Sequence, residues 1–234
     1  MFSVRVKKVK RYNKSISTII FDKELRSYPG QFIMLNVFGL EEIPLSLSSP
    51  NSVTVKAVGE TTQYLVNIKE GEFVGVKGPY GNMFSLTNGR ALLVAGGMGI
   101  APLHYLYLRL EECGADVRFL FGVKSQEDIC LTENIKDIVI ASEDGSVGIR
   151  GTVKDLIIRE NLEEFDKIYV CGPKAMTKFL ISYFKEKGVI DKAEFSLTGY
   201  MRCGFGVCGS CVLENGLRVC VDGPVVRGKE LKDI

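Results

Sequence analysis

The sequence predicts a multidomain protein of the β plus α/β class: an antiparallel β-barrel, then a parallel-sheet α/β domain, then a small cysteine-containing C-terminal module. Three observations predict this order. Apolar residues first alternate with polar ones in short runs, continuous apolar runs follow, and four of the seven cysteines lie between residues 203 and 220. We expect the three parts to span residues 1–88, 89–191 and 192–234.

Length and composition exclude several classes of protein. The chain has 234 residues, 46% of them hydrophobic and 25% charged, which is typical of a soluble globular protein with a sizeable core. Thirty basic and 28 acidic residues give a net charge of +2, so no nucleic-acid partner is expected. No apolar stretch is long enough to cross a membrane, and the N-terminus lacks the apolar core of a secretory signal. We therefore expect a cytoplasmic protein with reduced cysteines.

The first part alternates with a period of two residues. Val4 and Val6 form one such run, and the range 53–57 forms another, with turn residues at 28–30 and 49–51 between the runs. This pattern is typical of an antiparallel barrel or sandwich and needs no long helix.

The second part combines buried strands with helices. Strands are expected over the apolar runs at 91–95, 117–121, 138–141 and 168–171. Helices are expected at 102–112, after a capping box at Thr152–Asp155, and at 174–187 before Gly188. In the last helix, Met176 and the aromatic residues are expected to be core. Alternating strands and helices predict a parallel sheet with both faces covered.

The cysteine cluster is the most specific signal. Its members have the spacing C-x4-C-x2-C-x8-C, which is typical of plant-type ligands of a 2Fe-2S cluster: Cys203, Cys208, Cys211 and Cys220. Thiolates are soft anionic ligands that suit iron, and the glycines between them allow a tight loop. Four cysteines can also bind a structural zinc ion, and this alternative stays open. Cys113 and Cys130 are interpreted as buried or incidental thiols.

Two segments could hold a nucleotide. The strand at 91–95 leads into the glycines Gly96, Gly97 and Gly99 and then into a helix, which makes an anion site for a pyrophosphate. A tight structural turn would have the same sequence. The second segment, 171–173, follows a strand at the carboxyl edge of the sheet, where Cys171 could contact a nicotinamide ring or simply be buried.

The order of motifs along the whole chain resembles the ferredoxin-NADP reductase superfamily. The motifs are PLSLSS, GETT, GPYGNMF, AGGMGIAPL, CGPKAM, CGFGVCGSC and CVDGP. The chain is similar, more narrowly, to the electron-transfer subunits of NAD-dependent dihydroorotate dehydrogenases. The resemblance implies an FAD-binding barrel, an NAD-binding α/β domain and a 2Fe-2S module.

The resemblance also implies roles for individual residues. Ser46 would lie near the isoalloxazine ring, with Pro44 and Leu45 shaping its pocket. The FAD site would be completed by Thr54, Val55, Lys56, Thr61 and Thr62. The NAD pyrophosphate would lie on Gly96, Gly97 and Gly99, and the nicotinamide beside Cys171, Gly172 and Pro173. The four clustered cysteines match the cluster ligands of the family.

Two positions depart from the pattern of the family. Ile43 stands where an arginine usually pairs with the FAD pyrophosphate, and Thr61 stands where a glycine is common. Loss of a charge-assisted hydrogen bond would weaken FAD binding by about 1.5–3 kcal/mol unless another group replaces it.

The implied function is electron transfer in pyrimidine biosynthesis. Electrons from dihydroorotate would reach an FMN-containing catalytic subunit, and then pass through the 2Fe-2S cluster and FAD to NAD, in a heterotetramer of two subunits of each kind. No catalytic acid or base is expected in this chain, and His104 is interpreted as a surface or packing residue. Two alternatives remain: a reductase subunit serving ferredoxin, hydrogenase or sulfite reductase, and a zinc-stabilised binding module without a redox cofactor.

Overall fold

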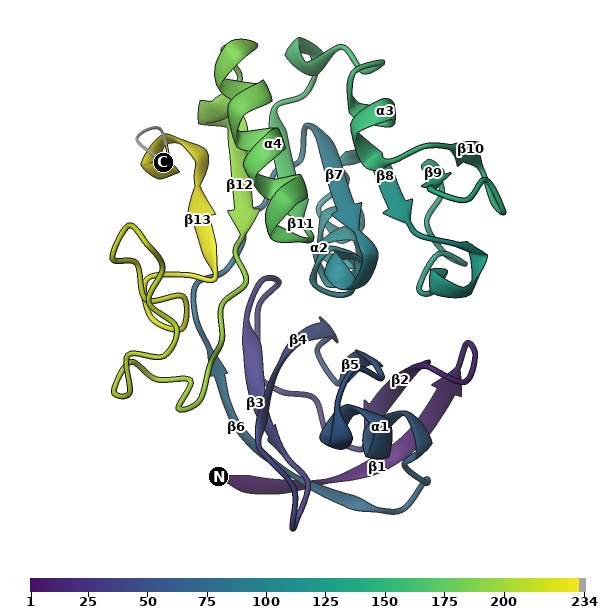
Figure 1. Ribbon diagram of the computed structural model, residues 1–234, viewed down its shortest axis with the longest axis vertical. Helices are drawn as coiled ribbons and strands as arrows, with labels where there is room; N and C mark the ends of the chain where they lie inside the picture. Colours follow the sequence, from purple (N-terminus) through teal and green to yellow (C-terminus); the bar gives the residue numbers. More distant parts are fainter. Residues whose placement is uncertain (232–234) are drawn as a thin grey trace.

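The computed structural model describes residues 1–231 and has two lobes, with a C-terminal module beside both (Figure 1). The lower lobe is a closed barrel with the strand order β1-β2-β5-β4-β3-β6, in which all neighbouring strands are antiparallel. Its strands are β1 (Phe2–Arg11), β2 (Ile16–Phe21), β3 (Phe32–Asn36), β4 (Ile43–Ser49), β5 (Ser52–Lys56) and β6 (Phe73–Tyr80). The predicted barrel is confirmed.

Alternation along the barrel strands explains why they close around a core. Val4 and Val6 of β1 are buried, whereas Arg5 between them is exposed. One helix, α1 (Glu60–Asn67), interrupts the barrel sequence before β6. The period-two pattern did not predict this helix, because only Thr61, Leu65 and Val66 of its eight residues are buried.

The upper lobe contains a seven-stranded sheet with the order β10-β9-β8-β7-β11-β12-β13. Its strands are β7 (Arg90–Gly96), β8 (Asp116–Val123), β9 (Ile138–Ser142), β10 (Ile149–Arg150), β11 (Lys167–Cys171), β12 (Ala193–Ser196) and β13 (Val225–Arg227). The first six are parallel, and β13 pairs antiparallel with β12 at the edge. The parallel α/β domain is therefore confirmed.

Helices cover both faces of this sheet. One face packs on α2 (Ile100–Glu112), and the other on α3 (Val153–Ile157) and α4 (Lys174–Glu186). Thr152 caps α3 through the predicted capping box with Asp155. Gly188 follows α4 with φ +70°, as expected of a residue that ends a helix. The short 3-10 segments are η1 (Gly97–Gly99), η2 (Gln126–Asp128), η3 (Leu162–Glu164), η4 (Ile190–Lys192) and η5 (Gly228–Leu231).

The predicted core stripe of α4 is correct for Met176 and Leu180, which are buried. It is wrong in part for the aromatic residues, because Phe179 and Tyr183 are only half-buried. Their rings stack on each other with centroids 5.7 Å apart at the rim of the core.

The cysteine module is inserted between two strands of the upper sheet. The prediction began this module at residue 192, but residues 193–196 form β12 and residues 225–227 form β13. The chain leaves the sheet after β12, runs along β3 and β6 of the barrel, and returns as β13 (Figure 1). Strands of three and four residues carry too little pattern to be separated from the cysteine-rich loop in the sequence.

The two lobes meet where α2 packs against β4. His104 of α2 lies with its Nδ1 2.9 Å from the carbonyl oxygen of Ser48, and burial lowers its pKa. This contact agrees with the predicted packing role of His104.

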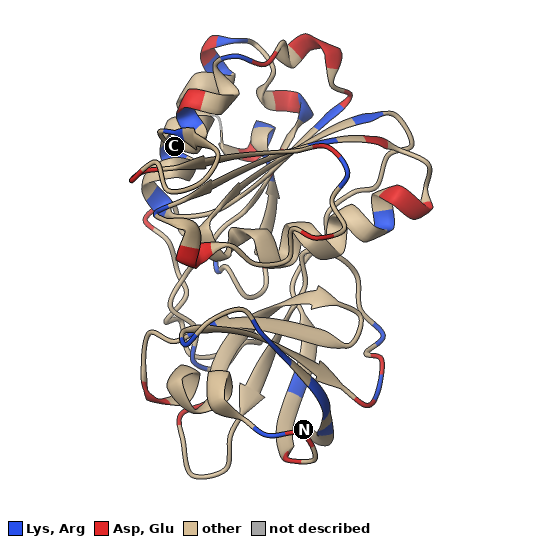
Figure 2. Ribbon diagram, turned by 90° about the vertical axis from the view of Figure 1, so that its right-hand side faces the viewer, with Lys and Arg blue, Asp and Glu red and all other residues tan. Residues whose placement is uncertain are grey.

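Figure 2 shows basic and acidic residues interspersed over both lobes in this view. Within residues 1–231, the helices are all too short or too polar to span a bilayer.

Candidate cofactor site

A cavity of about 410 Å³ opens where the barrel, the upper sheet and the cysteine module meet. The barrel contributes Phe32, Pro44, Leu45, Ser46 and Thr54. The upper lobe contributes Gly96, Gly97, Met98, Gly99, Ala101, Pro102, Cys171, Gly172, Pro173 and Ser196. The chain from Leu197 to Gly199, with Met201 and Pro224, closes the remaining side. Ten of the residues predicted to bind FAD or NAD therefore line one cavity, whose volume suits a planar organic cofactor.

The glycine turn after β7 reaches this cavity because it approaches β11 closely. A side chain at Gly99 would place its Cβ 2.0 Å from the carbonyl oxygen of Cys171. Gly97 has φ +50° and open space around it. The turn then enters α2, so backbone N–H groups at a helix N-terminus face the cavity beside the end of β11. This arrangement suits a pyrophosphate group.

Cys171 lies at the end of β11 and is 5% exposed. Burial raises the pKa of its thiol to about 11, and a hydrogen bond with Ser196 opposes that shift. The thiol is therefore neutral at physiological pH. A neutral, polarisable sulfur suits contact with an aromatic ring and not nucleophilic chemistry.

A second cavity, of about 270 Å³, adjoins the first and shares Gly96, Gly97 and Pro173 with it. It lies at the carboxyl ends of β7 and β8, and Lys56 enters it from the barrel. The Lys56 ammonium pairs with Asp128 of the upper lobe, with 2.5 Å between Nζ and Oδ1. Lys56 therefore brings a positive charge from the barrel to the predicted dinucleotide site. Ile43, at the position where the family usually has an arginine, carries no such charge.

The other predicted barrel residues lie outside both cavities. Ile43 begins β4 and packs on the barrel core, and the side chain of Val55 is buried in that core. Thr61 donates its hydroxyl hydrogen to the carbonyl oxygen of Glu41. The Thr62 hydroxyl accepts hydrogen bonds from the backbone at the start of α1. Contact of these four residues with FAD stays a prediction.

The four clustered cysteines form two pairs in the module. The Sγ atoms of Cys211 and Cys220 are 3.2 Å apart, and both residues are buried. Cys203 and Cys208 also contact each other through their side chains and are more exposed. Gly204 makes the close packing of this loop possible, since its φ is +80° and a Cβ there would lie 2.6 Å from Cγ of Met34.

Hydrogen bonds favour the thiolate forms of the more exposed pair, Cys203 and Cys208. The Ser210 side chain and backbone lower the pKa of Cys208 to about 6, and the backbone of Cys208 and Phe205 lowers the pKa of Cys203. Burial, together with the neighbouring Cys211, raises the pKa of Cys220 to about 11. The exposed pair thus favours the thiolate form that binds metal, whereas Cys220 must lose a proton when metal binds.

The arrangement of the four cysteines as two pairs suits a cluster with two metal ions. A tetrahedral zinc site would gather all four thiolates around one point. A 2Fe-2S cluster takes two thiolates at each iron, which matches the two pairs.

Comparison with known proteins decides the family. Residues 198–232 match the iron-sulfur cluster binding domain of dihydroorotate dehydrogenase B, and residues 93–181 match the oxidoreductase NAD-binding domain. The chain is 52% identical over 231 residues to the probable dihydroorotate dehydrogenase B (NAD(+)), electron transfer subunit, of Archaeoglobus fulgidus, with 99% of each chain covered. The chain belongs to this family. The same description applies to a relative from Methanocella arvoryzae, which is 38% identical over 98% of this chain and 91% of its own.

Solved structures agree with this family of electron transfer subunits. A chain from the structure of an NADH-dependent reduced ferredoxin-NADP oxidoreductase is 30% identical, with a TM-score of 0.83 over 98% of this chain and 90% of that one. A ferredoxin reductase of carbazole 1,9a-dioxygenase shares the fold at 21% identity and a TM-score of 0.71, over 82% of this chain and 68% of that one. The predicted superfamily and the predicted iron-sulfur domain are confirmed, and the zinc alternative is not supported. That Cys203, Cys208, Cys211 and Cys220 are the cluster ligands stays a prediction.

The sequence analysis missed several residues of the first cavity. Phe32, Met98, Ser196 and Met201 all line it. Their side chains are apolar or small, and nothing in the local pattern separates them from ordinary core residues. The one available signal was the position of Met201, two residues before the first clustered cysteine.

Proposed function

We propose that this protein is the subunit that connects an FMN-containing dihydroorotate dehydrogenase subunit to NAD, in the cytoplasm, as part of a heterotetramer with two copies of each subunit. The observation that carries the proposal is the junction of three parts of the chain at one cavity, with the four cysteines in the part that closes it. The names of the relatives supply the dehydrogenase, and the domain matches supply NAD and the iron-sulfur cluster.

The residues of this chain hold and separate the redox groups. Cys203, Cys208, Cys211 and Cys220 would hold the cluster. Pro44, Leu45 and Ser46 would position FAD, and the glycine turn with residues 171–173 would position NAD over it. When bound, FAD exchanges single electrons with the cluster and a hydride with NAD, a conversion that neither of them makes alone.

The reaction needs no acid or base from this chain. His104 is engaged by the Ser48 carbonyl group, and Cys171 is a neutral buried thiol. The chain therefore contributes binding, orientation and exclusion of water, and the acid-base chemistry of dihydroorotate oxidation belongs to the catalytic subunit.

The deciding experiment is co-purification with the FMN-containing subunit under anaerobic conditions. We expect the complex to reduce NAD with dihydroorotate, and the isolated chain to show flavin bleaching and a reduced 2Fe-2S signal in EPR spectra when NADH is added. An isolated chain that stays unreduced by NADH after reconstitution with FAD and cluster would contradict the proposal.

A second candidate is a subunit that exchanges electrons between NAD(P)H and ferredoxin. It is favoured by the 30% identical chain from the NADH-dependent reduced ferredoxin-NADP oxidoreductase structure. Both candidates share internal reduction by NADH, so the external partner distinguishes them. Ferredoxin-dependent turnover without any dihydroorotate-dependent activity of the co-purified complex would select the second candidate.

A further inference from the structure

Two side chains belong both to the cavity and to the packing around the cluster ligands. Phe32 and Met201 line the cavity of about 410 Å³. They are 2% and 9% exposed and pack in one apolar cluster that also contains Cys211 and Cys220. Two side chains that line the cavity therefore belong to the same apolar cluster as the buried pair of cluster cysteines. We call Phe32 and Met201 the apolar bridge.

Each half of the apolar bridge comes from a part of the chain that is fixed by other contacts. Phe32 begins β3 and pairs in register with Ser46, so the ring is attached to the strand pair that carries the predicted flavin contact. Met201 lies on the segment that lines the cavity at residues 196–199 and reaches the first clustered cysteine at residue 203. Barrel and module thus each supply one side chain to the same contact.

A second set of contacts fixes the module against the barrel. Gly204 packs on Met34 of β3, and the Tyr80 ring lies between Phe32 and Phe205, with centroid distances of 6.0 and 6.3 Å. These contacts hold the loop that carries the cluster cysteines against β3 and β6. The position of the buried cysteine pair relative to the cavity therefore depends on side-chain packing.

We propose that the apolar bridge is the contact through which electrons pass between the cluster cysteines and the flavin in the cavity. The inference rests on the proposed function and adds two positioning residues to it. Each passage oxidises the cluster by one electron and reduces the flavin by one. Two passages and one proton from solvent supply the hydride that forms the new C–H bond of NADH. Phe32 and Met201 themselves are neither oxidised nor reduced.

The test separates the two electron transfers in the full chain loaded with FAD and cluster. After rapid anaerobic mixing with NADH, flavin bleaching reports the first transfer and the EPR signal of freeze-quenched samples reports cluster reduction. A truncated side chain leaves a void that only partly collapses, so the groups around it shift. Misplacing reacting groups by about 1 Å can cost about 100-fold in rate. We therefore expect cluster reduction to slow about tenfold in Met201→Ala. We expect flavin bleaching to slow less than cluster reduction, because only cluster reduction passes through the apolar bridge. The EPR line shape checks that the cluster itself is intact.

Two further variants examine the chemistry of the contact. Met201→Leu conserves the apolar volume and should restore the rate of cluster reduction. Phe32→Leu tests the same contact from the barrel side, and it keeps the inference testable if Met201→Ala does not fold. Thermal unfolding of each variant without cofactors checks the fold independently of electron transfer.

Leu35→Ala is the matched control. Leu35 lies on the same strand as Phe32 and is buried, but it packs in the barrel core and lines neither cavity. We expect it to lose comparable stability while cluster reduction stays within about twofold of the wild type. Unchanged cluster reduction in Met201→Ala and Phe32→Leu, or an equal slowing in Leu35→Ala, would overturn the inference. A wild-type chain whose flavin is not bleached by NADH would instead overturn the proposed function.

Discussion

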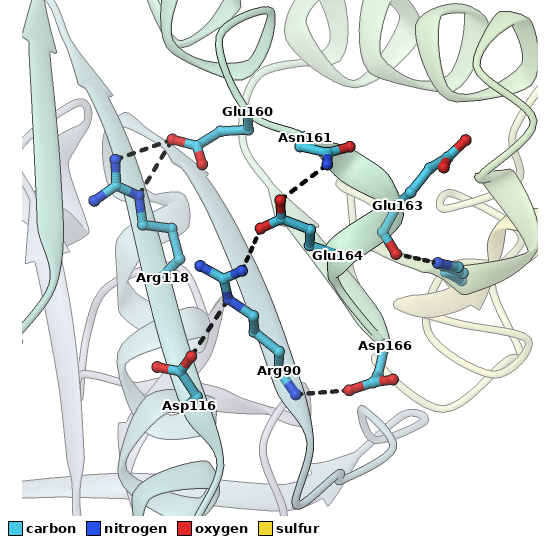
Figure 3. Close-up of polar contacts among 9 residues, drawn as sticks. Arg90, Asp116, Arg118, Glu160, Asn161, Glu163, Glu164 and Asp166 are labelled. Atoms are coloured by element: carbon cyan, nitrogen blue, oxygen red, sulfur yellow. Dashed lines mark hydrogen bonds and ion pairs between the residues drawn. The ribbon is translucent and has the colours of Figure 1, made fainter.

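At the amino ends of β7 and β8, arginine side chains are paired with carboxylates, whereas at the carboxyl ends of the same strands glycines face two cavities. Arg90 pairs with Glu164, and its Nε lies 3.3 Å from Asp116, while Arg118 lies 3.0 Å from Glu160 (Figure 3). Gly96 and Gly122, at the other ends of these strands, both line the second cavity.

The difference shows that the amino edge of the sheet contributes to stability, whereas the carboxyl edge is suited to ligand binding. The ion pairs at the amino edge bind the segment around η3 to the strands, and Arg90 also lies over the Phe165 ring at 5.0 Å. The carboxyl edge leaves backbone N–H groups and open space for a ligand, as in other open parallel sheets. Substitutions at the carboxyl edge should therefore change cofactor binding, and those at the amino edge should change the free energy of unfolding.

The largest expected effect is that of Gly99→Ala at the carboxyl edge. Because the new Cβ would lie 2.0 Å from the Cys171 carbonyl oxygen, the turn must move away from β11. A pyrophosphate bound at this turn would then lose a hydrogen bond to a charged group, which contributes about 1.5–3 kcal/mol, so we expect NADH affinity to fall about ten- to 100-fold, measured by calorimetric titration of the FAD-loaded protein. Gly114→Ala, just beyond the other end of α2, is the control, since it meets open space, lines neither cavity and costs only backbone strain of about 1–2 kcal/mol. Equal NADH affinity in the two variants would contradict the comparison.

The next effect is that of Lys56→Met, which removes a cation from the second cavity. A charge-assisted hydrogen bond contributes about 1.5–3 kcal/mol, so dinucleotide affinity should fall at least about tenfold. The flavin content of the purified variant and the affinity of the loaded protein for NADH distinguish which pyrophosphate Lys56 meets.

Lys77→Met is a closely matched control for Lys56. Both lysines are on barrel strands and have 33% exposed side chains, and each pairs with one partly buried carboxylate, Asp128 for Lys56 and Glu42 for Lys77. Lys77 lines neither cavity. Equal loss of dinucleotide affinity in both variants would show that the effect comes from the lost ion pair alone.

The sequence predicted those parts of the molecule whose signals are local. The buried strands of the upper sheet, the capping box at Thr152 and the spacing of the four cysteines each depend on a few neighbouring residues. The carboxyl-edge glycines were found because a strand, a turn and a helix follow one another directly in the chain.

Features that depend on tertiary contacts could not be predicted in this way. The insertion of the module between β12 and β13 depends on an edge strand of three residues, which has no periodicity to detect. The position of Lys56 depends on Asp128, 72 residues away in the other lobe. The apolar cluster that contains Phe32 and Met201 likewise joins residues far apart in the chain, and each of them alone has the sequence character of an ordinary core residue.

A smaller effect is expected for Arg118→Met at the amino edge. Arg118 is 27% exposed and binds two carboxylates, Asp137 and Glu160. We expect the free energy of unfolding to fall by about 1 kcal/mol in urea titrations, with NADH affinity unchanged. Lys136→Met removes a more exposed ion pair with Glu111 and should have no measurable effect. A change of NADH affinity in Arg118→Met would contradict the conclusion that the amino edge affects stability and not cofactor binding.

The smallest effect concerns the pH dependence of the same edge. Hydrogen bonds from Asn161 and Arg90 lower the pKa of Glu164 from its ordinary value of 4.5. A carboxyl whose pKa is lower in the folded state stabilises the fold above the unfolded value, and this contribution is lost as the pH falls through the folded value. The difference in unfolding midpoint between wild type and Glu164→Gln should therefore be present at pH 7 and should vanish progressively below about pH 4.5. Glu163→Gln is the control, because Glu163 contributes only its backbone carbonyl oxygen, which accepts a hydrogen bond from Lys192. A difference for Glu164→Gln that persists unchanged at pH 3 would mean that neutral hydrogen bonds, and not charge, hold η3 to the amino edge of the sheet.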